Sequence, residues 1–285
     1  MINVLEEKIK SVSLTKTQKR IAEYFLKNQE RIGNLASLEV AKEIGVSDAS
    51  IIRFSRKIGY GGYAALKNDI YDNLAGKAMD GIGHLRPTER FGITKHRFSK
   101  ENLRDSFLAL MEHNLKKALL ANAQKDFELA VQTIHRAQKK LVIGFHACKG
   151  TALQFSRLLA IVEPGVSLLM TSDPEDYVHL QNLREDDVVI VFSFARHYQA
   201  DVDFIRYVKR RRAKIILITD SVLAPHAKRA DILFVTATSH MSFFNSQTGA
   251  ICIAEYLITL LSKTYDYVVR LDERDSLMAH LLMKD

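Results

Sequence analysis

Apolar side chains recur at two different spacings along the chain, and the spacing changes near residue 100. In residues 1–75 they return every three to four positions, which is the period of an amphipathic helix. The stretch 18–28, for example, places Ile21, Tyr24, Phe25 and Asn28 near one another on a helix. No strand pattern interrupts this region, so it predicts an all-α bundle of about five short helices.

Residues 101–285 show a different alternation, in which short apolar runs follow helical stretches. Two long helical patterns, 101–123 and 126–137, come first, and the closing helix is predicted at 246–263. Four or five strands of four to six residues are predicted between them, within 139–145, 167–170, 186–194, 213–219 and 231–237. Strands separated by helices are typical of βαβ units, so this region predicts an α/β domain with a parallel sheet.

The segment 76–100 separates these two patterns. It contains glycines, a proline and scattered cations, and its apolar residues follow no period. Such a composition is typical of a linker. The predicted organisation is therefore a helical domain at 1–75, a basic linker at 76–100 and an α/β domain at 101–285.

Two short helices joined by a tight turn stand at the centre of the helical domain. Ser37 and Ser47 each precede a helical stretch, and we predict both as N-caps. Gly45 lies between the helices, where a residue of positive φ commonly ends the first of them. The small residues Ala41 and Gly45 let the two helices cross closely. The segment therefore predicts a helix-turn-helix motif.

The second of these helices divides into an apolar and a basic side. Ser47, Phe54 and Ile58 fall on the side of Ile51 and are predicted to face the core. The opposite side carries Ala49, Ile52, Arg53 and Arg56, flanked by Ser50 and Lys57. A basic face is most often simply solvated, but an isoleucine among the cations favours contact with a thymine methyl group. We predict insertion into the DNA major groove, with a solvated face as the alternative.

Composition narrows the class of protein without changing this picture. The chain has 285 residues, of which 47% are apolar and 26% charged, and its formal charge of +8 favours an anionic partner. Two cysteines, Cys148 and Cys252, are too few for a disulfide framework and fit a reducing compartment. The N-terminus shows no signal peptide, and Glu255 interrupts the long apolar stretch 250–261. We expect a cytoplasmic protein without a membrane segment.

The second helix and the residues after it form a specific motif, made of Ser47, the sequence IIRF at 51–54 and the sequence KIGYGGY at 57–63. This motif resembles the N-terminal domain of the RpiR family of bacterial transcription regulators, and the resemblance covers residues 1–75. It implies DNA binding. The side chains predicted to contact DNA are Ser47, Ala49, Ser50, Ile52, Arg53, Arg56, Lys57, Tyr60 and Tyr63. The family pairs this domain with a sugar isomerase (SIS) domain of flavodoxin-like α/β fold, which agrees with the alternation after residue 100.

Ligands of open parallel sheets bind beyond the carboxyl ends of the strands. The loops expected there are 144–150, 193–198 and 219–221. A helix that begins after such a loop favours an anion through its free N–H groups, and Lys149 and Arg196 add positive charge. We expect Arg196 to contact the ligand, because a guanidinium can bind phosphate or carboxylate with two parallel hydrogen bonds.

These loops depart from the phosphosugar-binding pattern of SIS domains, which typically has a serine in the first loop and Ser-x-Ser-Gly-x-Thr in the second. Cys148 replaces the first serine, and only Ser193 remains of the second pattern, since Ala195, Arg196, His197 and Tyr198 follow in place of Ser, Gly, any residue and Thr. The loop is similar to a subgroup with Ser-Phe-x-Arg-Tyr and a later Phe-Phe-x-Ser, here residues 243–246. The predicted ligand-binding residues are His146, Cys148, Lys149, Ser193, Arg196, His197, Tyr198 and Ser246.

Most of these residues have a purely structural alternative, which the sequence leaves open. Cys148 is equally a small packed thiol, and Lys149 is equally a surface charge. Tyr198 can cap the helix that follows it. His146 and His197 are either acid–base groups or ordinary hydrogen-bonding side chains.

The predicted function is a DNA-binding transcriptional regulator whose SIS domain senses a small anionic metabolite, a phosphosugar or a related sugar derivative. A homodimer or homotetramer places two recognition helices roughly 34 Å apart, which predicts a palindromic operator. A third class, a protein that coats nucleic acid without sequence preference, also satisfies the charge.

The alternative is a sugar-phosphate isomerase, which needs a general base beside its substrate. The strand-end loops supply no glutamate, and Glu163, followed by Pro164 and Gly165, is typical of a helix end. Ring opening by His146 or His197 stays open. The sequence has no HExxH, CxxC or Walker motif, so we predict no enzyme activity, no cofactor and no metal.

Overall fold

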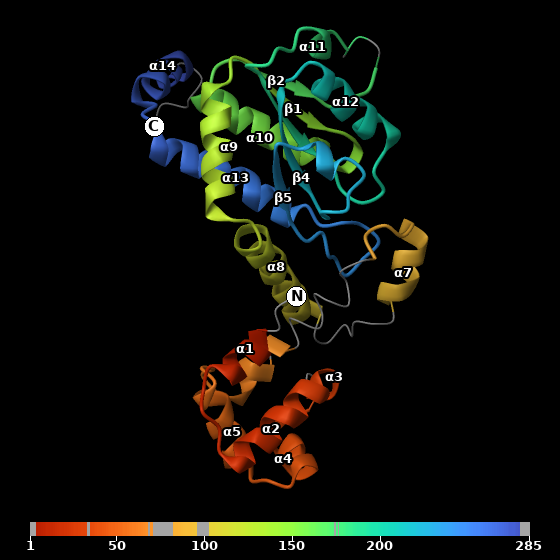
Figure 1. Cartoon of the computed structure of the whole chain (residues 1–285), viewed down its shortest axis with the longest axis vertical. Helices are drawn as coiled ribbons and strands as arrows, with labels where there is room; N and C mark the ends of the chain where they lie inside the picture. Colours follow the sequence, from red (N-terminus) through yellow and green to blue (C-terminus); the bar gives the residue numbers. More distant parts are fainter. Residues whose placement is uncertain are drawn as a thin grey trace. The chain divides into compact units, whose positions relative to one another are not determined.

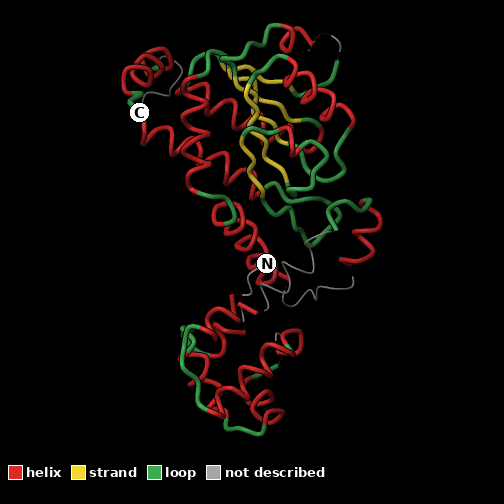
Figure 2. Tube along the Cα trace, viewed as in Figure 1, coloured by secondary structure: helices red, strands yellow, loops and turns green. Residues whose placement is uncertain are grey.

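The computed structural model describes residues 4–32, 35–67, 69–70, 82–95, 103–173, 175 and 177–279. Figure 1 shows the chain coloured along its sequence, and Figure 2 shows its secondary structure. The chain divides into two compact units. One comprises residues 1–81 with 100–110, and the other comprises residues 82–99 with 111–285.

The helices of the first unit follow the predicted amphipathic pattern. They are α1 (Val4–Lys10), α2 (Lys16–Lys27), α3 (Gln29–Ile32), α4 (Ser37–Ile44) and α5 (Asp48–Lys57), and the first turns of α8 (Leu103–Leu120) also belong to this unit. Three aromatic rings meet in its core. The ring centroid of Phe25 lies 5.5 Å from that of Phe54 and 6.3 Å from that of Tyr63. The predicted all-α region is confirmed.

The start of α4 differs from the prediction by one residue. Ala36, and not Ser37, is the N-cap, and its backbone N–H donates to Oε2 of Glu39 at 2.6 Å. Glu39 therefore satisfies this end of the helix from within the first turn, and Ser37 becomes the first helical residue. The prediction for Ser47 is confirmed, because its extended backbone and its side chain cap α5.

A five-stranded parallel sheet of order β2-β1-β3-β4-β5 forms the centre of the second unit (Figure 2, yellow). The strands are β1 (Lys140–Gly144), β2 (Val166–Leu169), β3 (Val188–Phe192), β4 (Lys214–Thr219) and β5 (Ile232–Val235), each within or beside a predicted stretch. The adjacent strands β1 and β3 end in register, since Gly144 pairs with Phe192. The loops that follow these two strands therefore begin side by side.

Helices cover both faces of the sheet, because successive strand residues point to opposite sides. Val142 packs in the core beneath α9 (Gln124–Arg136), α10 (Lys149–Val162) and α13 (Thr248–Thr264). Its neighbours Leu141 and Ile143 pack on the other side, in the core beneath α11 (Tyr177–Gln181) and α12 (Gln199–Arg210). The α/β prediction is confirmed as a three-layer domain.

The apolar stretch 250–261 forms the middle of α13, which packs against α9 and α10. Glu255, which interrupts this stretch, is exposed. Within the residues that the structure describes, no helix is both long and apolar enough to cross a membrane.

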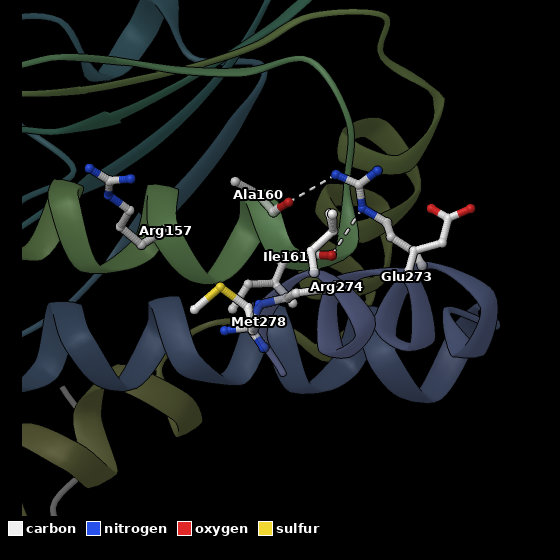
Figure 3. A pocket seen from close by; sticks show the side chains of 8 residues that line it. Arg157, Ala160, Ile161, Glu273, Arg274 and Met278 are labelled. Carbon is white, nitrogen blue, oxygen red and sulfur yellow. Dashed lines mark hydrogen bonds between the residues drawn. The ribbon is translucent and has the colours of Figure 1, made fainter. Parts of the chain in front are cut away.

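Two further helices lie where the sequence predicted none. Within the predicted linker, α7 (Pro87–Lys95) belongs to the second unit, and the prediction that α13 closes the fold is wrong because α14 (Val268–Met278) follows it. Arg270 of α14 donates to the carbonyl oxygens of Ala160 and Ile161 in α10, each at 2.9 Å (Figure 3). A hollow of about 500 Å³ lies beside these contacts and is lined by both helices.

Candidate functional site

A left-handed residue holds the turn between α4 and α5. Gly45 has φ +72°, and the N–H groups of Gly45 and Val46 donate back to the carbonyls of Lys42 and Ala41. A side chain at position 45 would strain this backbone. Arg20 of α2 donates to the carbonyl of Ile44 at 2.7 Å. The contacts fix the direction of α5 against α4, as a helix-turn-helix requires.

The buried side of α5 matches the prediction with one exception. Ile51, Phe54 and Ile58 are buried. Ser47 is exposed, and its placement in the buried stripe is wrong because an N-cap has extended rather than helical backbone angles. Its hydroxyl oxygen accepts from the Ser50 N–H at 3.3 Å. Ser47 therefore sets where the helix begins.

The basic side of α5 is open to solvent. Arg53, Arg56 and Lys57 are exposed together with Ala49, while Ser50 and Ile52 are half-buried. Arg53 donates to the Ser50 hydroxyl at 3.3 Å, and Lys57 donates to Gln18 of α2 at 3.1 Å. Throughout the described ranges, no ion pair engages these three cations. Their charge is available for phosphate groups.

The two tyrosines predicted to contact DNA serve the domain itself. Tyr63 is buried, and its hydroxyl donates to the carbonyl of Leu35 at 2.9 Å. Burial raises the pKa of Tyr63 to about 12. Tyr60 is half-buried, and its hydroxyl donates to Asp69 while the Lys8 ammonium lies 4.2 Å from its ring centroid. Tyr63 is therefore not among the side chains that we propose to contact DNA.

A cavity of about 390 Å³ opens beyond the carboxyl ends of β1 and β3. Its lining residues are Phe145, His146, Ala147, Cys148, Phe194, Ala195, Arg196, Tyr198, Asp201, Phe244, Asn245 and Gln247. Four predicted ligand residues are among them: His146, Cys148, Arg196 and Tyr198. The lining does not include the other four, which are Lys149, Ser193, His197 and Ser246.

Two residues of this lining have a backbone conformation that is rare for side chains other than glycine. His146 has φ 50° and Arg196 has φ 66°, and within the described ranges only Arg212 joins them among non-glycine residues. Such a conformation costs on the order of 1–3 kcal/mol and is concentrated at functional sites. Arg196 occupies the position at which the phosphosugar-binding pattern has glycine. The glycine-like backbone is thus kept while a cation is placed beside the cavity.

Behind the lining, Ser193 belongs to a buried polar network. Its hydroxyl donates to Oδ2 of Asp201 at 2.6 Å, and Nδ1 of His197 lies 3.2 Å from the same hydroxyl oxygen. Nε2 of His197 lies 3.9 Å from Oδ1 of Asp220. Burial lowers the pKa of His197, although Asp220 and Asp201 oppose the shift. Because the Ser193 proton is held by Asp201, His197 does not activate this serine as a nucleophile.

The remaining predicted residues divide between the cavity and the scaffold. The imidazole of His146 stacks on the Tyr198 ring at 3.6 Å between centroids, and both line the cavity. Burial raises the pKa of Cys148 to about 12, so its thiol is neutral at pH 7 and behaves as a packed residue. Lys149 is exposed. Ser246 is buried just before the start of α13, where its hydroxyl oxygen accepts from the Thr248 N–H at 3.2 Å.

Two long helices begin at the cavity. The residues before α10 and α13, Cys148 and Gln247, line it, and neither caps its helix with a side chain. The partial positive charge of a helix N-terminus favours an anion. The N-terminus of α12 differs, because Asp201 already accepts from the Tyr198 N–H there. The sequence patterns did not identify Asp201 and Gln247 as cavity residues. The sign that could have indicated Asp201 is its position as an acidic residue in the first turn of α12.

One wall of the cavity is also held from outside by α7. The guanidinium of Arg90 donates to the carbonyl oxygen of Phe244 and to Oδ1 of Asn245, both of which line the cavity. Asn245 in turn donates to the carbonyl of Gly83 at 3.3 Å. Arg90 is only 1% exposed, and burial, with Arg196 nearby, lowers its pKa. The segment 82–95 is thus bonded to the cavity wall.

No group of three or more histidine, cysteine, aspartate and glutamate side chains in the described ranges is arranged to hold a metal ion. The cavity instead offers one guanidinium, one carboxylate, two amides and several aromatic faces. This set suits a small polar organic ligand.

Comparison with known proteins accounts for both parts of the chain. The model of the helix-turn-helix domain of the rpiR family matches residues 3–77, and the model of the SIS domain matches residues 133–260. The chain therefore has the helix-turn-helix domain of RpiR-family transcriptional regulators, followed by a SIS domain. The resemblance found in the motif at 47–63 is confirmed, and so is the pairing of the two domains.

Transcriptional regulators related to this chain align with most of its length. An HTH-type transcriptional regulator of Caldanaerobacter subterraneus is 29% identical over 281 residues, which cover 93% of each chain. The RpiR regulator of Escherichia coli is 21% identical over 276 residues, which cover 93% of this chain and 85% of RpiR.

Solved structures share the fold. The sugar isomerase domain of an RpiR transcription factor from Sphaerobacter thermophilus has a TM-score of 0.59 and 24% identity, covering 61% of this chain and 99% of that domain. The Vibrio vulnificus NanR protein, solved in complex with ManNAc-6P, has a TM-score of 0.55 and 15% identity, covering 99% of this chain and 100% of NanR.

Proposed function

We propose that this regulator binds a DNA operator through α5 and senses a small anionic metabolite in the cavity beyond β1 and β3. The metabolite class is a phosphosugar or a related sugar derivative. The observation that supports this most strongly is Arg196, a cation at a glycine-like φ on the cavity lining. The NanR structure, in which a relative in fold holds a sugar phosphate, supports the ligand class.

On the DNA side, the exposed Arg53, Arg56 and Lys57 would neutralise phosphates while residues at the start of α5 approach base edges. Ile52, half-buried, would offer its remaining apolar surface to a thymine methyl group. We propose a homodimer or homotetramer, whose recognition helices lie roughly 34 Å apart on a palindromic operator.

The proposed route from ligand to DNA runs through Arg90. A ligand that contacts Phe244 or Asn245 changes the acceptors that Arg90 holds, and α7 lies in the segment between the DNA-binding and SIS domains. Ligand control requires only that the metabolite favour one arrangement of this segment over another. The difference in affinity between the two arrangements then equals the coupling free energy.

A sugar-phosphate isomerase is a second candidate function, which one observation favours. No glutamate lines the described cavity, but Asp201 does, and burial raises its pKa despite the Ser193 hydrogen bond. A carboxylate with a raised pKa is a possible general base. The regulator stays the first proposal because the chain has a DNA-binding domain that an isomerase does not need.

The ligand proposal is tested by adding a panel of hexose and pentose phosphates to the complex of the full-length protein with operator DNA. We expect at least one of them to change operator affinity in the natural protein. Arg196→Ala should keep operator binding and lose this response, whereas Lys149→Ala, exposed and outside the lining, should keep both. A normal response from Arg196→Ala would remove Arg196 from the site, and turnover of a sugar phosphate would favour the isomerase.

A further inference from the structure

The cavity that holds Arg196 also contains a carboxylate, which an anion site would ordinarily exclude. Asp201, in the first turn of α12, lines the cavity and is 5% exposed. An ionised carboxylate in a buried site is costly unless hydrogen bonds or a cation compensate its charge. The hydrogen bonds and charges around the Asp201 carboxylate therefore indicate the chemistry of the ligand. An oxygen of this carboxylate that lacks a hydrogen bond is a place for a ligand donor.

The hydrogen bonds to Asp201 all reach one of its two oxygens. Oδ2 accepts from the Ser193 hydroxyl at 2.6 Å and from the Tyr198 N–H at 3.4 Å. Among the described residues, no hydrogen bond reaches Oδ1, and Oδ1 is not completely buried. Oδ1 is therefore a free acceptor at the border of the cavity.

Carboxylates also occupy the donors that a phosphate would otherwise use in the loop 193–198. Asp201 holds the Ser193 hydroxyl and the N–H of Tyr198, the residue before α12, and Oδ2 of Asp220 accepts from the Ala195 N–H at 2.9 Å. An oxyanion in this part of the cavity would find these donors taken and would face two negative charges. Arg196 of the same loop and the N-termini of α10 and α13 remain available to it.

The cavity lining thus offers Arg196 and two helix N-termini, which favour an anion, together with the Asp201 carboxylate, which favours a cation. The imidazoles of His146 and His197 attract the Asp201 carboxylate, but neither donates a hydrogen bond to it within the described ranges. The aromatic faces of Phe145 and Phe194 in the same lining also favour a cation over an anion.

We propose that the ligand is a sugar phosphate with a free amine, whose phosphate lies at Arg196 and whose ammonium group donates to Oδ1 of Asp201. This assignment rests on the proposed function, since it names the class of metabolite sensed at the same site. An ammonium beside Asp201 supplies the missing hydrogen bond and neutralises the carboxylate. A hydroxyl supplies only the hydrogen bond, and an N-acetyl group removes the charge.

The test is calorimetric binding of three probes to the full-length protein: the 6-phosphates of glucosamine, N-acetylglucosamine and glucose. They differ only at the second carbon, where they have an ammonium, an amide and a hydroxyl group. We expect glucosamine 6-phosphate to bind at least about tenfold more tightly than the other two, which corresponds to about 1.4 kcal/mol.

Asp201→Asn, which keeps an oxygen acceptor for Ser193 and Tyr198 but loses the charge, should abolish that preference. Asp220→Asn, which removes a carboxylate outside the lining, should keep it.

The possible results separate this assignment from the proposed function. Equal binding of the three probes, or no binding of glucosamine 6-phosphate, overturns the amine assignment. If all three then bind the natural protein and none binds Arg196→Ala, the anion site still stands. Binding that survives Arg196→Ala contradicts the proposed site itself. Turnover of glucosamine 6-phosphate that disappears in Asp201→Asn would instead make Asp201 a general base.

Discussion

Replacing Arg90 with glutamine should disconnect ligand binding from DNA binding. The natural side chain makes two hydrogen bonds, to the Phe244 carbonyl and to Asn245, and is almost completely buried. Hydrogen bonds to a charged group contribute about 1.5–3 kcal/mol each, and the desolvation that lowers the pKa of Arg90 offsets part of the sum. A net contribution of about 2–3 kcal/mol remains. Allosteric coupling typically amounts to about 1–3 kcal/mol, so losing this contact is enough to remove it.

The assay is fluorescence anisotropy of labelled operator DNA, titrated with protein in the presence and absence of a sugar phosphate that shifts the natural protein. Arg90→Gln should bind the operator and the sugar phosphate, but its operator affinity should change less than about threefold on ligand addition. Arg86→Gln is the matched control, because Arg86 lies just before α7 and, among the described residues, pairs only with the exposed Glu89. A full ligand response in Arg90→Gln would refute the proposed route through α7.

Two further predictions concern groups that the function does not use. Glu163→Gln should lower the free energy of unfolding by about 3–5 kcal/mol in urea titrations. The Lys140 ammonium lies 3.0 Å from Glu163 and both side chains are buried, so the substitution leaves a buried positive charge without its partner. A loss below about 1 kcal/mol, the size expected for an exposed pair, would contradict this prediction. Cys148 should resist iodoacetamide at pH 8 in the folded protein and react after denaturation, and mass spectrometry follows both reactions. The reason is that a pKa raised to about 12 leaves almost no thiolate until the pH approaches that value. Fast alkylation of the folded protein would show that the thiol is not packed.

The sheet and its helices could be predicted because apolar side chains determine them. All five residues of β3 are buried, as parallel strands covered on both faces require, and the sequence shows them as an unbroken apolar run. α7 could not be found in the same way. Its buried residues are Arg90 and Thr94, while Phe91 is exposed, so its sequence has no apolar stripe. Only tertiary hydrogen bonds to the cavity wall account for the burial of an arginine there.

The candidate site was predictable to the extent that strand ends determine it. Arg196 follows β3 directly, and the carboxyl end of a parallel strand is where ligands bind. Asp201 was missed because an acidic residue in the first turn of a helix is an ordinary capping residue. Its proposed contact with the ligand depends on how the loop 193–198 folds back, so that Oδ2 accepts from the Ser193 hydroxyl and the Tyr198 N–H. The sequence contains no local sign of that arrangement.

Recognition of a specific DNA sequence by α5 is tested most directly by anisotropy binding to the DNA upstream of the chain's own gene. The measurement compares this DNA with a scrambled duplex at two salt concentrations. It uses the natural protein, Arg53→Ala, and Arg136→Ala as a control for loss of an exposed cation outside the DNA-binding domain.

We predict that the natural protein prefers the upstream DNA by about a thousandfold or more, the usual range of specific recognition. Arg53→Ala should lose most of this preference, and Arg136→Ala should retain it. Equal binding of both duplexes by all three proteins, together with no preferred site in a library of genomic fragments, would contradict the account.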